Sequence, residues 1–489
     1  MADTLIVGGG SAGSVLAERL SADPAHSVRL LEAGPLWTST ETVPAELLDA
    51  AVLPIGPEVE WLWRYPVTLA DDPPVPASIV RGKVIGGSGA VNGCYFVRAT
   101  AADFAAWSRR LGGCAEWSFD AVLPVYRRIE RDSDFGEQPW HSSSGPIPVQ
   151  RSAVPSSVSA AFTAACLAAG FAEVPDLNAP TAGDGVGAVP CNCYQGRRIS
   201  SALGYLLPAL DRPNLNVAGG TYVTRIRFDG SRAVGVDYVR DGELGTEWAD
   251  RIVLSAGAIE SAALLLRSGI GDPDRLRALG IPVVHAAGVG TGFSDHLEIG
   301  LDYVLDADYA SDAAESPAVA LESVLEVGDI EIRPYAMSFT PGVRRLGVGL
   351  MRPHSSGVLR LRTADPADAP VLEHHYLTEE RDRARLRAAV PIAAGLLRRM
   401  NARPLASIPE RGDLDAWLYA NLDTLQHLSG TCRMGLENDP AAVVDERCRV
   451  YGVTGLSIVD LSVVPVPLGR GPQATVLMIA EKAAAYLAT

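Results

Sequence analysis

Residues 427–435 read HLSGTCRMG, in which a histidine is followed by a small polar loop and an arginine. A neutral imidazole can accept a proton near neutral pH, because the ordinary pKa of histidine is about 6.5. The chain contains eight histidines, however, and residue type alone favours a structural or exposed position for each of them. His427 therefore has two interpretations. It caps the loop before Gly430, or it is a general base in a site that both ends of the chain build.

The start of the chain holds a second candidate for chemistry, a glycine-rich turn. Residues 4–7 form a short apolar run that predicts a buried parallel strand. GGGSAG follows at residues 8–13 and matches the GxGxxG pattern, and apolar residues then recur at helical spacing. A helix that begins at such a turn presents free N–H groups and the positive end of its dipole, which suits a phosphate.

A carboxylate at the end of the next predicted strand completes this pattern. The strand covers residues 28–31 and ends at Glu32, 19 positions after Gly13. Dinucleotide-binding folds place an acidic residue about 20 positions after the glycines, where it binds ribose hydroxyls. Strand, turn, helix and carboxylate together predict a dinucleotide site. NAD and FAD share this fingerprint, so this stretch alone does not choose between them.

A second glycine-rich stretch, RGKVIGGSGAVNGCYFVR at residues 81–98, lacks the GK[ST] ending of a phosphate-binding P-loop. It resembles the first signature of the glucose–methanol–choline (GMC) flavin oxidoreductases, and GAIESAALLLRSGIG resembles their second signature. HLSGTCRMG and VYGVTGLSIVDLSVVP resemble C-terminal blocks of the same family. The resemblance covers nearly the whole chain in order. Its segments are 81–98, 200–217, 257–271, 352–376, 427–435 and 450–465.

The resemblance implies an α/β fold with two domains, a discontinuous Rossmann-like FAD-binding domain and a substrate-binding cap of antiparallel sheet and helices, the GMC fold. The alternating residues 358–361 predict a strand of the cap sheet, and the run near 380–400 predicts a cap helix. We expect the FAD-binding domain to comprise residues 1–148, 194–300 and 427–489, and the substrate-binding domain to comprise residues 149–193 and 301–426.

The resemblance also implies the cofactor and its contacts. Some members of the family tether FAD through a histidine in the first loop, but the matching position here is Val91, so we expect FAD to be bound noncovalently. A helix beginning near Ala474 would direct its positive dipole end towards the cofactor. The residues expected to bind FAD are Gly8, Gly10, Ser11, Ala12, Gly13, Glu32, Ala33, Arg81, Gly86, Gly87, Asn92, Val223, Asp460, Leu461, Ala474 and Thr475.

Two residues are candidates for catalysis. His427 matches the family's catalytic histidine, which implies that it removes the hydroxyl proton of an alcohol while hydride passes to flavin N5. The family's second polar partner, His or Asn, aligns with Gln473 here. An amide cannot act as a base, but it can donate to and accept from a substrate oxygen. If Gln473 does not reach the substrate, His427 works alone.

A narrower resemblance concerns the substrate. GGSGAVNGCYF, the short chain and Gln473 are similar to GMC proteins associated with mycofactocin, a peptide-derived redox cofactor. This similarity implies a dehydrogenase that oxidises reduced mycofactocin and passes electrons to a quinone or cytochrome of the respiratory chain. The alternatives are an alcohol dehydrogenase or oxidase acting on a small alcohol, a non-redox flavin lyase, and a protein that binds FAD only for structure.

Composition excludes other classes of function. The chain has 42 Lys and Arg against 58 Asp and Glu, a formal net charge of −16, whereas a nucleic-acid surface needs a basic excess. The opening MADTLIVGGG lacks a signal peptide's basic segment, and no apolar run of about 20 residues predicts a membrane span. We expect a cytoplasmic protein, with a peripheral membrane contact left open. The seven cysteines include no CxxC pair, so the sequence predicts free thiols and no metal site.

Overall fold

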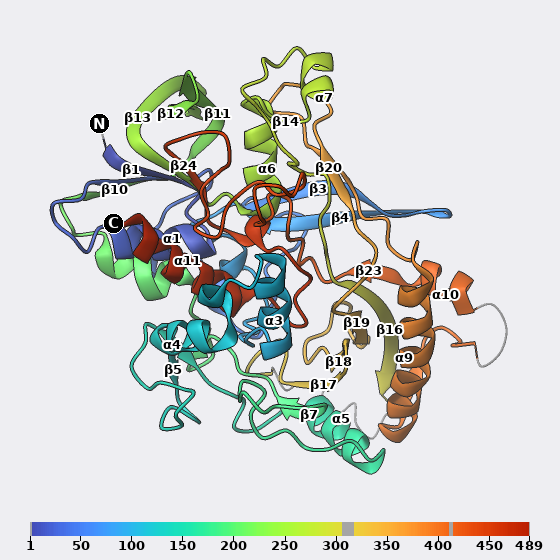
Figure 1. The fold of residues 1–489 in the computed structure, drawn as a ribbon. Helices are drawn as coiled ribbons and strands as arrows, with labels where there is room; N and C mark the ends of the chain where they lie inside the picture. The colour runs from blue at the N-terminus through green and yellow to red at the C-terminus, as the bar shows by residue number, and fades with distance from the viewer. Residues whose placement is uncertain (1, 306–316, 410–413, 489) are drawn as a thin grey trace.

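The computed structural model describes residues 2–305, 317–409 and 414–488. The glycine-rich turn joins a parallel sheet, built from distant parts of the chain, to the first helix (Figure 1). Leu5 and Ile6 of its β1 strand are fully buried, as expected for a parallel strand covered on both faces. In spatial order its strands are β10 (Leu215–Ala218), β2 (Val28–Leu31), β1 (Ala2–Val7), β13 (Glu243–Leu254) and β24 (Leu456–Ile458).

The long strand β13 belongs to two layers. Its second half pairs in parallel with β1, whereas its first half pairs antiparallel with β12 (Arg232–Arg240). β12 in turn pairs with β11 (Thr221–Asp229), so the three strands form a ribbon beside the parallel sheet. β11 approaches the end of β2, because the N–H of Thr221, its first residue, donates to the carbonyl oxygen of Glu32 at 2.8 Å.

Helices from the two ends of the chain pack against each other. α1 (Ser11–Leu20) and α11 (Gln473–Leu487) lie side by side in Figure 1. Arg19 of α1 donates from its Nε to both carboxylate oxygens of Glu481 on α11, at 3.0 and 3.1 Å. Both helices were expected from the sequence and both are confirmed. A third helix, α6 (Gly257–Arg267), follows β13.

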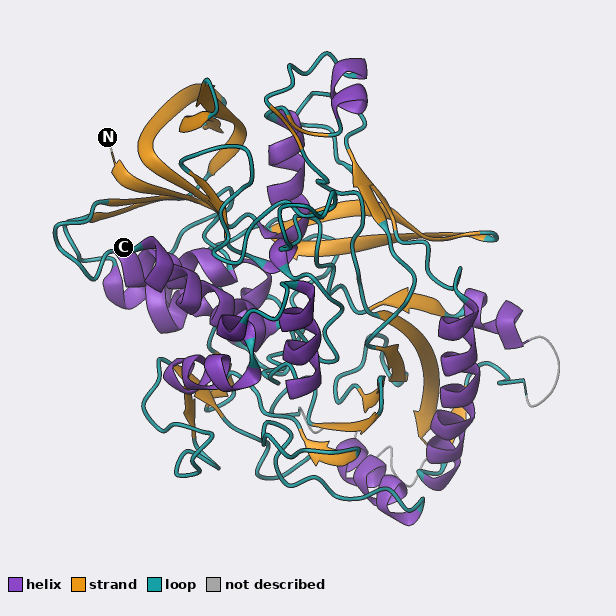
Figure 2. Cartoon of the chain, in the orientation of Figure 1, coloured by secondary structure: helices purple, strands orange, loops and turns teal. Residues whose placement is uncertain are grey.

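A second sheet forms the cap expected for the GMC fold (Figure 2). Helix α9 (Glu380–Arg399), predicted near 380–400, and helix α5 (Ser157–Ala168) pack against it. The strand pairs are antiparallel, and β23 (Leu422–Thr424) adds to one strand, β16. In spatial order the strands are β22 (Ala402–Pro404), β16 (Leu297–Leu305), β19 (Arg344–Leu350), β18 (Ile330–Pro334), β17 (Ser323–Val327) and β7 (Gly185–Ala188).

One expected cap strand lies elsewhere. Residues 358–361 do form a strand, β20 (Val358–Arg360), but it pairs with β21 (Val371–Glu373) in a separate small sheet with β3 (Leu62–Asp71) and β4 (Pro74–Gly82). The prediction that it belongs to the cap sheet is wrong. Alternating residues specify which face of a strand is buried, but its neighbours depend on contacts distant in sequence.

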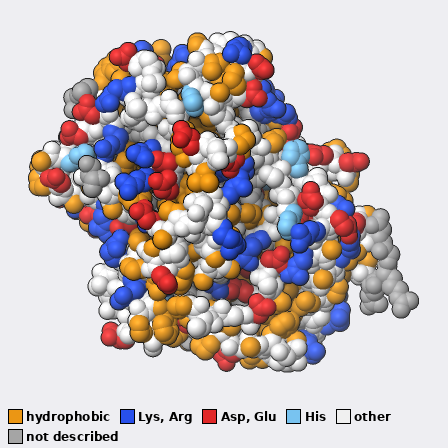
Figure 3. Space-filling model, in the orientation of Figure 1, with side chains coloured by type: hydrophobic (Ala, Val, Ile, Leu, Met, Phe, Trp, Pro, Cys, Tyr) orange, Lys and Arg blue, Asp and Glu red, His pale blue; other side chains and the backbone are white. Residues whose placement is uncertain are grey.

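The remaining helices and strands connect these parts. They are α2 (Ala45–Leu48), α3 (Ala101–Arg110), α4 (Phe119–Ile129), α7 (Pro273–Ala278), α10 (Leu414–Ala420), β5 (Glu130–Asp132), β6 (Ile147–Val149), β8 (Cys193–Tyr194), β9 (Arg197–Arg198), β14 (Ile270–Gly271) and β15 (His285–Ala286). Among the helices of the described residues, none combines the length and the apolar character needed to cross a bilayer. On the face drawn in Figure 3, acidic and basic side chains are interspersed.

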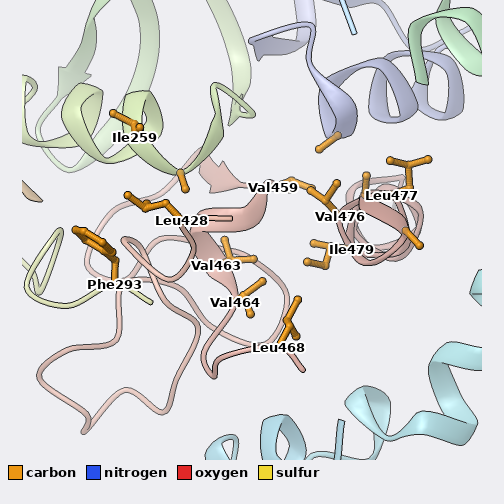
Figure 4. Close-up of a cluster of buried hydrophobic side chains, with 14 of the residues drawn as sticks. Ile259, Phe293, Leu428, Val459, Val463, Val464, Leu468, Val476, Leu477 and Ile479 are labelled. Atoms are coloured by element: carbon orange, nitrogen blue, oxygen red, sulfur yellow. The ribbon is translucent and has the colours of Figure 1, made fainter. Parts of the chain in front are cut away.

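A buried apolar cluster fixes the C-terminal segments against one another. Figure 4 shows Val464 and Leu468 on the side of Ile479 and Val476 of α11, whereas Leu428 lies at the other side of the same cluster, towards Ile259. Each of these side chains is at most 7% exposed. Burying apolar surface stabilises such contacts by about 25 cal/mol per Å². The cluster therefore fixes the loop that carries His427 relative to the helix that begins at Gln473.

Candidate active site

A cavity of about 580 Å³ lies between the parallel sheet and the cap. Its walls include the residues just after β1, β2 and β13, which is the carboxyl edge where open α/β sheets bind their ligands. The cap contributes residues of β16, β18 and β19 to the opposite wall. Ligand pockets commonly have volumes of about 300–1,000 Å³.

Most residues predicted to bind FAD line this cavity, and so do both catalytic candidates, His427 and Gln473. The sequence separates these two from the glycine turn by more than 400 positions, and the fold brings them to the same space. The predicted FAD-binding residues on the cavity wall are Gly8, Gly10, Ser11, Ala12, Glu32, Ala33, Arg81, Gly87, Asn92, Val223, Asp460 and Leu461.

Gly13 and Gly86, which were also predicted to bind FAD, do not line the cavity but let backbone segments behind its wall approach each other. A Cβ atom on Gly13 would lie 1.9 Å from the carbonyl oxygen of Gly8, so only glycine allows α1 to approach β1 this closely. Gly86 has φ +91°, and its N–H donates to the carbonyl oxygen of Gly9 at 2.8 Å. Both glycines therefore shape the loops whose neighbours line the cavity.

Ala474 and Thr475 do not line the cavity, in contrast to Gln473 immediately before them. Successive residues of an α-helix are rotated by about 100°, so the two side chains of this first turn point away from the one at Gln473. Thr475 is buried, and its hydroxyl forms a hydrogen bond of 2.8 Å with the hydroxyl of Tyr126. The side chains at these two positions support the helix start.

The two glycine loops touch each other at the start of α1. A Cβ atom on Gly87, where φ is +55°, would lie 2.7 Å from the Cα atom of Gly10. Gly10 is the N-cap of α1, and no side chain caps the helix there. The first-turn N–H groups therefore have no partner within the helix, which is the arrangement that binds phosphate groups.

Glu32 is held rigidly at the end of β2. Its Oε2 accepts from the N–H of Gly9 at 2.7 Å, and its Oε1 accepts from the N–H of Gly34 at 2.8 Å. Burial raises the pKa of Glu32 to about 7, against the effect of these two hydrogen bonds. Each carboxylate oxygen has a second lone pair, so Glu32 can still accept from a ribose hydroxyl.

Sequence reasoning missed a group of aromatic residues around Glu260 on the cavity wall. Trp63 and Tyr222 have ring centroids 5.4 Å apart, and both rings lie on the wall. Tyr65 donates to Glu260 Oε1 at 2.9 Å, and Tyr222 donates to Glu260 Oε2 at 3.2 Å. Tyr222 precedes the predicted contact Val223, which was the available signal, whereas Trp63 and Tyr65 come from a hairpin far away in sequence. Aromatic faces of this kind can stack against an adenine ring.

Asp460 combines a structural role with its place on the cavity wall. Its Oδ2 accepts from the N–H of Gly257 at 3.0 Å and from the hydroxyl of Ser261 at 2.6 Å, and its Oδ1 accepts from the N–H of Ser462 at 2.8 Å. Burial raises the pKa of Asp460. The carboxyl thus ties the segment after β24 to the start of α6.

His427 lies beside a second histidine. Its Nδ1 is 2.9 Å from Nδ1 of His296, and its backbone N–H donates to Asp295 Oδ1 at 2.6 Å. Burial, together with the charges of His296 and Arg333, lowers the pKa of His427 well below its ordinary value. His427 is therefore a neutral imidazole at physiological pH, which is the form that can act as a base.

Asp295 anchors the loop that holds His427. Burial opposes its ionisation, but a hydrogen bond from His374 and the positive charge of Arg81 hold the pKa of Asp295 below its ordinary value. Its Oδ2 accepts from the hydroxyl of Thr424 at 2.9 Å. Neither Asp295 nor His296 belongs to a motif that the sequence analysis used.

Away from this cavity, Glu130, Asp132 and His141 are buried close together in a geometry that could bind a metal ion. Arginines already neutralise the carboxylates. Arg98 lies 2.5 Å from Glu130 Oε1, and Arg151 lies 2.9 Å from Asp132 Oδ2. The group is accounted for as a buried ion-pair network.

The features of the main cavity fit FAD. The N-terminus of α1, which no side chain caps, suits the pyrophosphate of FAD. The buried carboxylate of Glu32 suits its ribose, and the rings of Trp63 and Tyr222 suit its adenine. The opposite end holds a neutral histidine, where redox chemistry on a substrate can take place. This arrangement agrees with the cofactor expected from the sequence.

Comparisons with known proteins agree with this geometry. The profile of the GMC oxidoreductases matches residues 2–298 and 353–480. An uncharacterised GMC-type oxidoreductase from the thcA 5' region of Rhodococcus erythropolis is 45% identical, over 99% of this chain and 98% of the relative. The mitochondrial choline dehydrogenase of Mus musculus is 34% identical, over 98% of this chain and 88% of its own.

Solved structures match the fold over the whole chain. Pyridoxine 4-oxidase from Mesorbium loti superposes with a TM-score of 0.90 at 29% identity and covers 99% of both chains. A formate oxidase has a TM-score of 0.89 over 99% of this chain and 98% of its own, but at 22% identity it supports the fold alone. The chain therefore belongs to the GMC oxidoreductase family, and its cofactor is FAD.

Proposed function

We propose that the protein is a dehydrogenase that oxidises an alcohol to a carbonyl compound, with reduced mycofactocin as its substrate and a quinone or cytochrome of the respiratory chain as its electron acceptor. Oxidation of CH–OH groups follows from membership of the family. The identity of the substrate, and that of the electron acceptor, are what we propose. The observation that carries the oxidation is a neutral His427 on the wall of the same cavity as the nucleotide loop.

The chain's own residues prepare the alcohol for oxidation. Neutral His427 accepts the hydroxyl proton, and Arg333, whose positive charge reaches His427, favours the deprotonated oxygen. Gln473 Oε1 already accepts from the hydroxyl of Ser11 at 3.2 Å, so its Nε2–H groups are the ones left to donate to the substrate oxygen. When bound, FAD supplies the acceptor for the hydride that leaves the carbinol carbon.

The cap side of the cavity supports a bulky substrate. Leu321 and Phe339 line it with apolar surface, to which Leu53 and Ile55 add from the segment before β3, and Phe339 is 48% exposed. A substrate that covered this rim would remove the exposed ring from water. A peptide-derived molecule such as mycofactocin offers enough surface to do so, whereas a very small alcohol does not. Delivery of electrons to the respiratory chain then requires a peripheral contact with the membrane.

Charge on the cavity wall argues against a cationic small alcohol. Arg333 donates to Glu298 Oε2 at 3.1 Å and to Glu331 Oε2 at 3.0 Å, so both carboxyls already face a cation. Burial raises the pKa of Glu298 and raises that of Glu331 to about 7, which weakens their negative charge further. A quaternary ammonium that entered beside Arg333 would meet two carboxyls that are already paired with this arginine. An uncharged small alcohol stays the alternative substrate.

Anaerobic absorption spectra of the purified holoenzyme test this proposal. Reduced mycofactocin, simple alcohols and choline are added separately, with the His427→Asn holoenzyme as the matched control. We expect mycofactocin to bleach the flavin of the wild-type protein and to leave the variant oxidised. Bleaching by a simple alcohol alone would replace mycofactocin with the small-alcohol alternative, and peroxide formation in air would identify an oxidase. No bleaching by any of them would favour the lyase or the structural role of FAD.

A further inference from the structure

The imidazole of His296 stands between His427 and a backbone carbonyl. His296 is 4% exposed, and its Nε2 lies 2.8 Å from the carbonyl oxygen of Leu468. Its Nδ1 lies 2.9 Å from Nδ1 of His427, and the two rings are nearly perpendicular at 87°. Two hydrogen bonds therefore connect the backbone carbonyl of Leu468, through the ring of His296, to His427 on the cavity wall. We call this series the relay.

The chemistry of these groups determines which ring nitrogens of His296 and His427 carry a hydrogen. A carbonyl oxygen only accepts, so Nε2 of His296 carries a hydrogen and donates to Leu468. A neutral imidazole has one N–H, so Nδ1 of His296 has none and must accept. The partner at 2.9 Å, Nδ1 of His427, is then the donor. The remaining nitrogen of His427, Nε2, keeps its lone pair, and the hydrogen bonds of His427 to described residues use only its Nδ1 and its backbone N–H.

His296 accepts at Nδ1 only when its ring is neutral, and its surroundings provide that state. Burial lowers the pKa of His296 to about 4, and Arg333 contributes in the same direction. Asp295 and Asp103 act in the opposite direction but are outweighed. The charged groups that face His427 are Asp295, Arg333 and Arg81, besides His296 itself. Burial and the charge of Arg333 outweigh the charge of Asp295 at both rings, so both rings are uncharged near pH 7.

We propose that His296 is a positioning residue, which transmits the polarity of the Leu468 carbonyl to His427 and so holds His427 in the tautomer that has its hydrogen on Nδ1 and a free lone pair on Nε2. This proposal rests on the proposed function, because a lone pair on Nε2 matters if His427 is the base. The tautomer of a histidine is set by the hydrogen bond of its other nitrogen, and here that bond comes from a second histidine.

The segments that hold the relay are rigid. Leu468 is 2% exposed and packs in the apolar cluster of Figure 4, so its carbonyl has a fixed direction. Asp295 Oδ1 accepts the backbone N–H of His427 at 2.6 Å and fixes the other side of the pair. Two neighbouring residues, Asp295 and His296, thus hold the backbone and the ring of the same base.

Nitrogen NMR of the holoenzyme with ¹⁵N-labelled histidine tests the relay, because protonated and unprotonated ring nitrogens have well-separated shifts. The signals of His427 are identified by their loss in His427→Asn. We expect a protonated Nδ1 and an unprotonated Nε2 in the wild type. In His296→Leu, which lacks an acceptor, we expect a mixture of tautomers. In His296→Asn, whose side-chain oxygen can accept from Nδ1, we expect the wild-type tautomer.

Rates of anaerobic flavin reduction are measured on the same samples. We expect His296→Leu to be about tenfold slower or more, as part of the roughly 10²–10⁴-fold contribution of a general base, and His296→Asn to recover most of the rate. A wild-type His427 protonated on Nε2 would overturn the relay, and so would a slow His296→Leu with an unchanged tautomer. If the tautomers behave as expected but His427→Asn reduces its flavin at the wild-type rate, the relay stands and the proposed base fails.

Discussion

The hydroxyl of Ser11 donates to Oε1 of Gln473 at 3.2 Å and thereby joins residues that are 462 positions apart in the chain. Ser11 opens the helix after the first glycine turn, and Gln473 opens the last helix. A Cβ atom on Gly89, in the second glycine loop, would lie 2.8 Å from Nε2 of Gln473. Gln473 therefore meets both glycine loops, in addition to lining the cavity. In this orientation the Oε1 atom of Gln473 faces Ser11 and its Nε2 atom faces Gly89.

This orientation predicts how substitutions of Gln473 will act. Gln473→Glu keeps an oxygen for Ser11 but replaces the Nε2–H donors with a second acceptor. We expect flavin reduction to slow by about 10- to 100-fold, the loss of one hydrogen bond to a charged oxygen. Ser11→Ala leaves the donors in place and should change the rate less than about threefold. Stopped-flow measurements at saturating substrate compare the two, and a wild-type rate for Gln473→Glu would show that the amide does not touch the substrate oxygen.

Contact between the glycine loops predicts a specific defect in Gly87→Ala. Its Cβ atom would approach Gly10 to 2.7 Å, so the loops must separate at the pyrophosphate site. Gly230, with φ +58° and nothing within 4 Å of a Cβ atom, is the matched control for backbone strain alone. We expect both variants to lose about 1–2 kcal/mol from the positive φ, and Gly87→Ala to lose roughly 1–3 kcal/mol more from the clash.

Urea unfolding of the apoproteins and titration with FAD measure these effects. Weaker FAD binding in Gly87→Ala, with normal binding in Gly230→Ala, would place the contact at the cofactor. Equal FAD affinities in the two variants would contradict it.

The lowered pKa of His427 predicts that kcat/KM falls at a more acidic pH than it would with an ordinary histidine as the base. The base works only when neutral, so acidification abolishes activity as the pH falls through the pKa of the folded protein. Because burial first, and then His296 and Arg333, lower this pKa well below 6.5, kcat/KM should stay on its plateau at pH 6.5 and fall only at more acidic pH. Steady-state rates across pH, with FAD absorbance checked at each point, measure the limb. A half-maximal rate near pH 6.5 would show that His427 titrates as an ordinary histidine.

The pairing of Arg333 with Glu298 predicts a preference between two alcohols of the same shape. Choline carries a quaternary nitrogen, and its carbon isostere is neutral. Because the carboxyls beside Arg333 are already paired, we expect the neutral isostere to reduce the flavin faster and choline to give little or no reduction. Anaerobic reduction rates at equal concentrations decide this. Faster reduction by choline would mean that a carboxylate in the cavity is free to bind the cation.

Prediction from the sequence succeeded where the determinants are close together in the chain. The strand, turn and helix before Glu32 lie within the first 32 residues, and their spacing is sufficient to place the carboxylate at the glycine turn. It failed where the partner is distant. β20 was correctly predicted as a strand but assigned to the wrong sheet, and His296 meets His427 across 131 positions with no motif to mark it. The FAD contacts expected at Ala474 and Thr475 stay predictions, because their side chains lie off the cavity wall and only their backbone at the start of α11 is left to meet the cofactor.

The packing of α1 against α11 has a consequence for how the protein is made. Residues 1–32 leave the ribosome early, yet β24 and α11, which complete the sheet and close the site, are translated more than 400 residues later. N-terminal segments fold first during synthesis, so the glycine turn has to wait for its last partner. The cavity for FAD is therefore completed only after α11 (Gln473–Leu487) has been synthesised and has packed against α1.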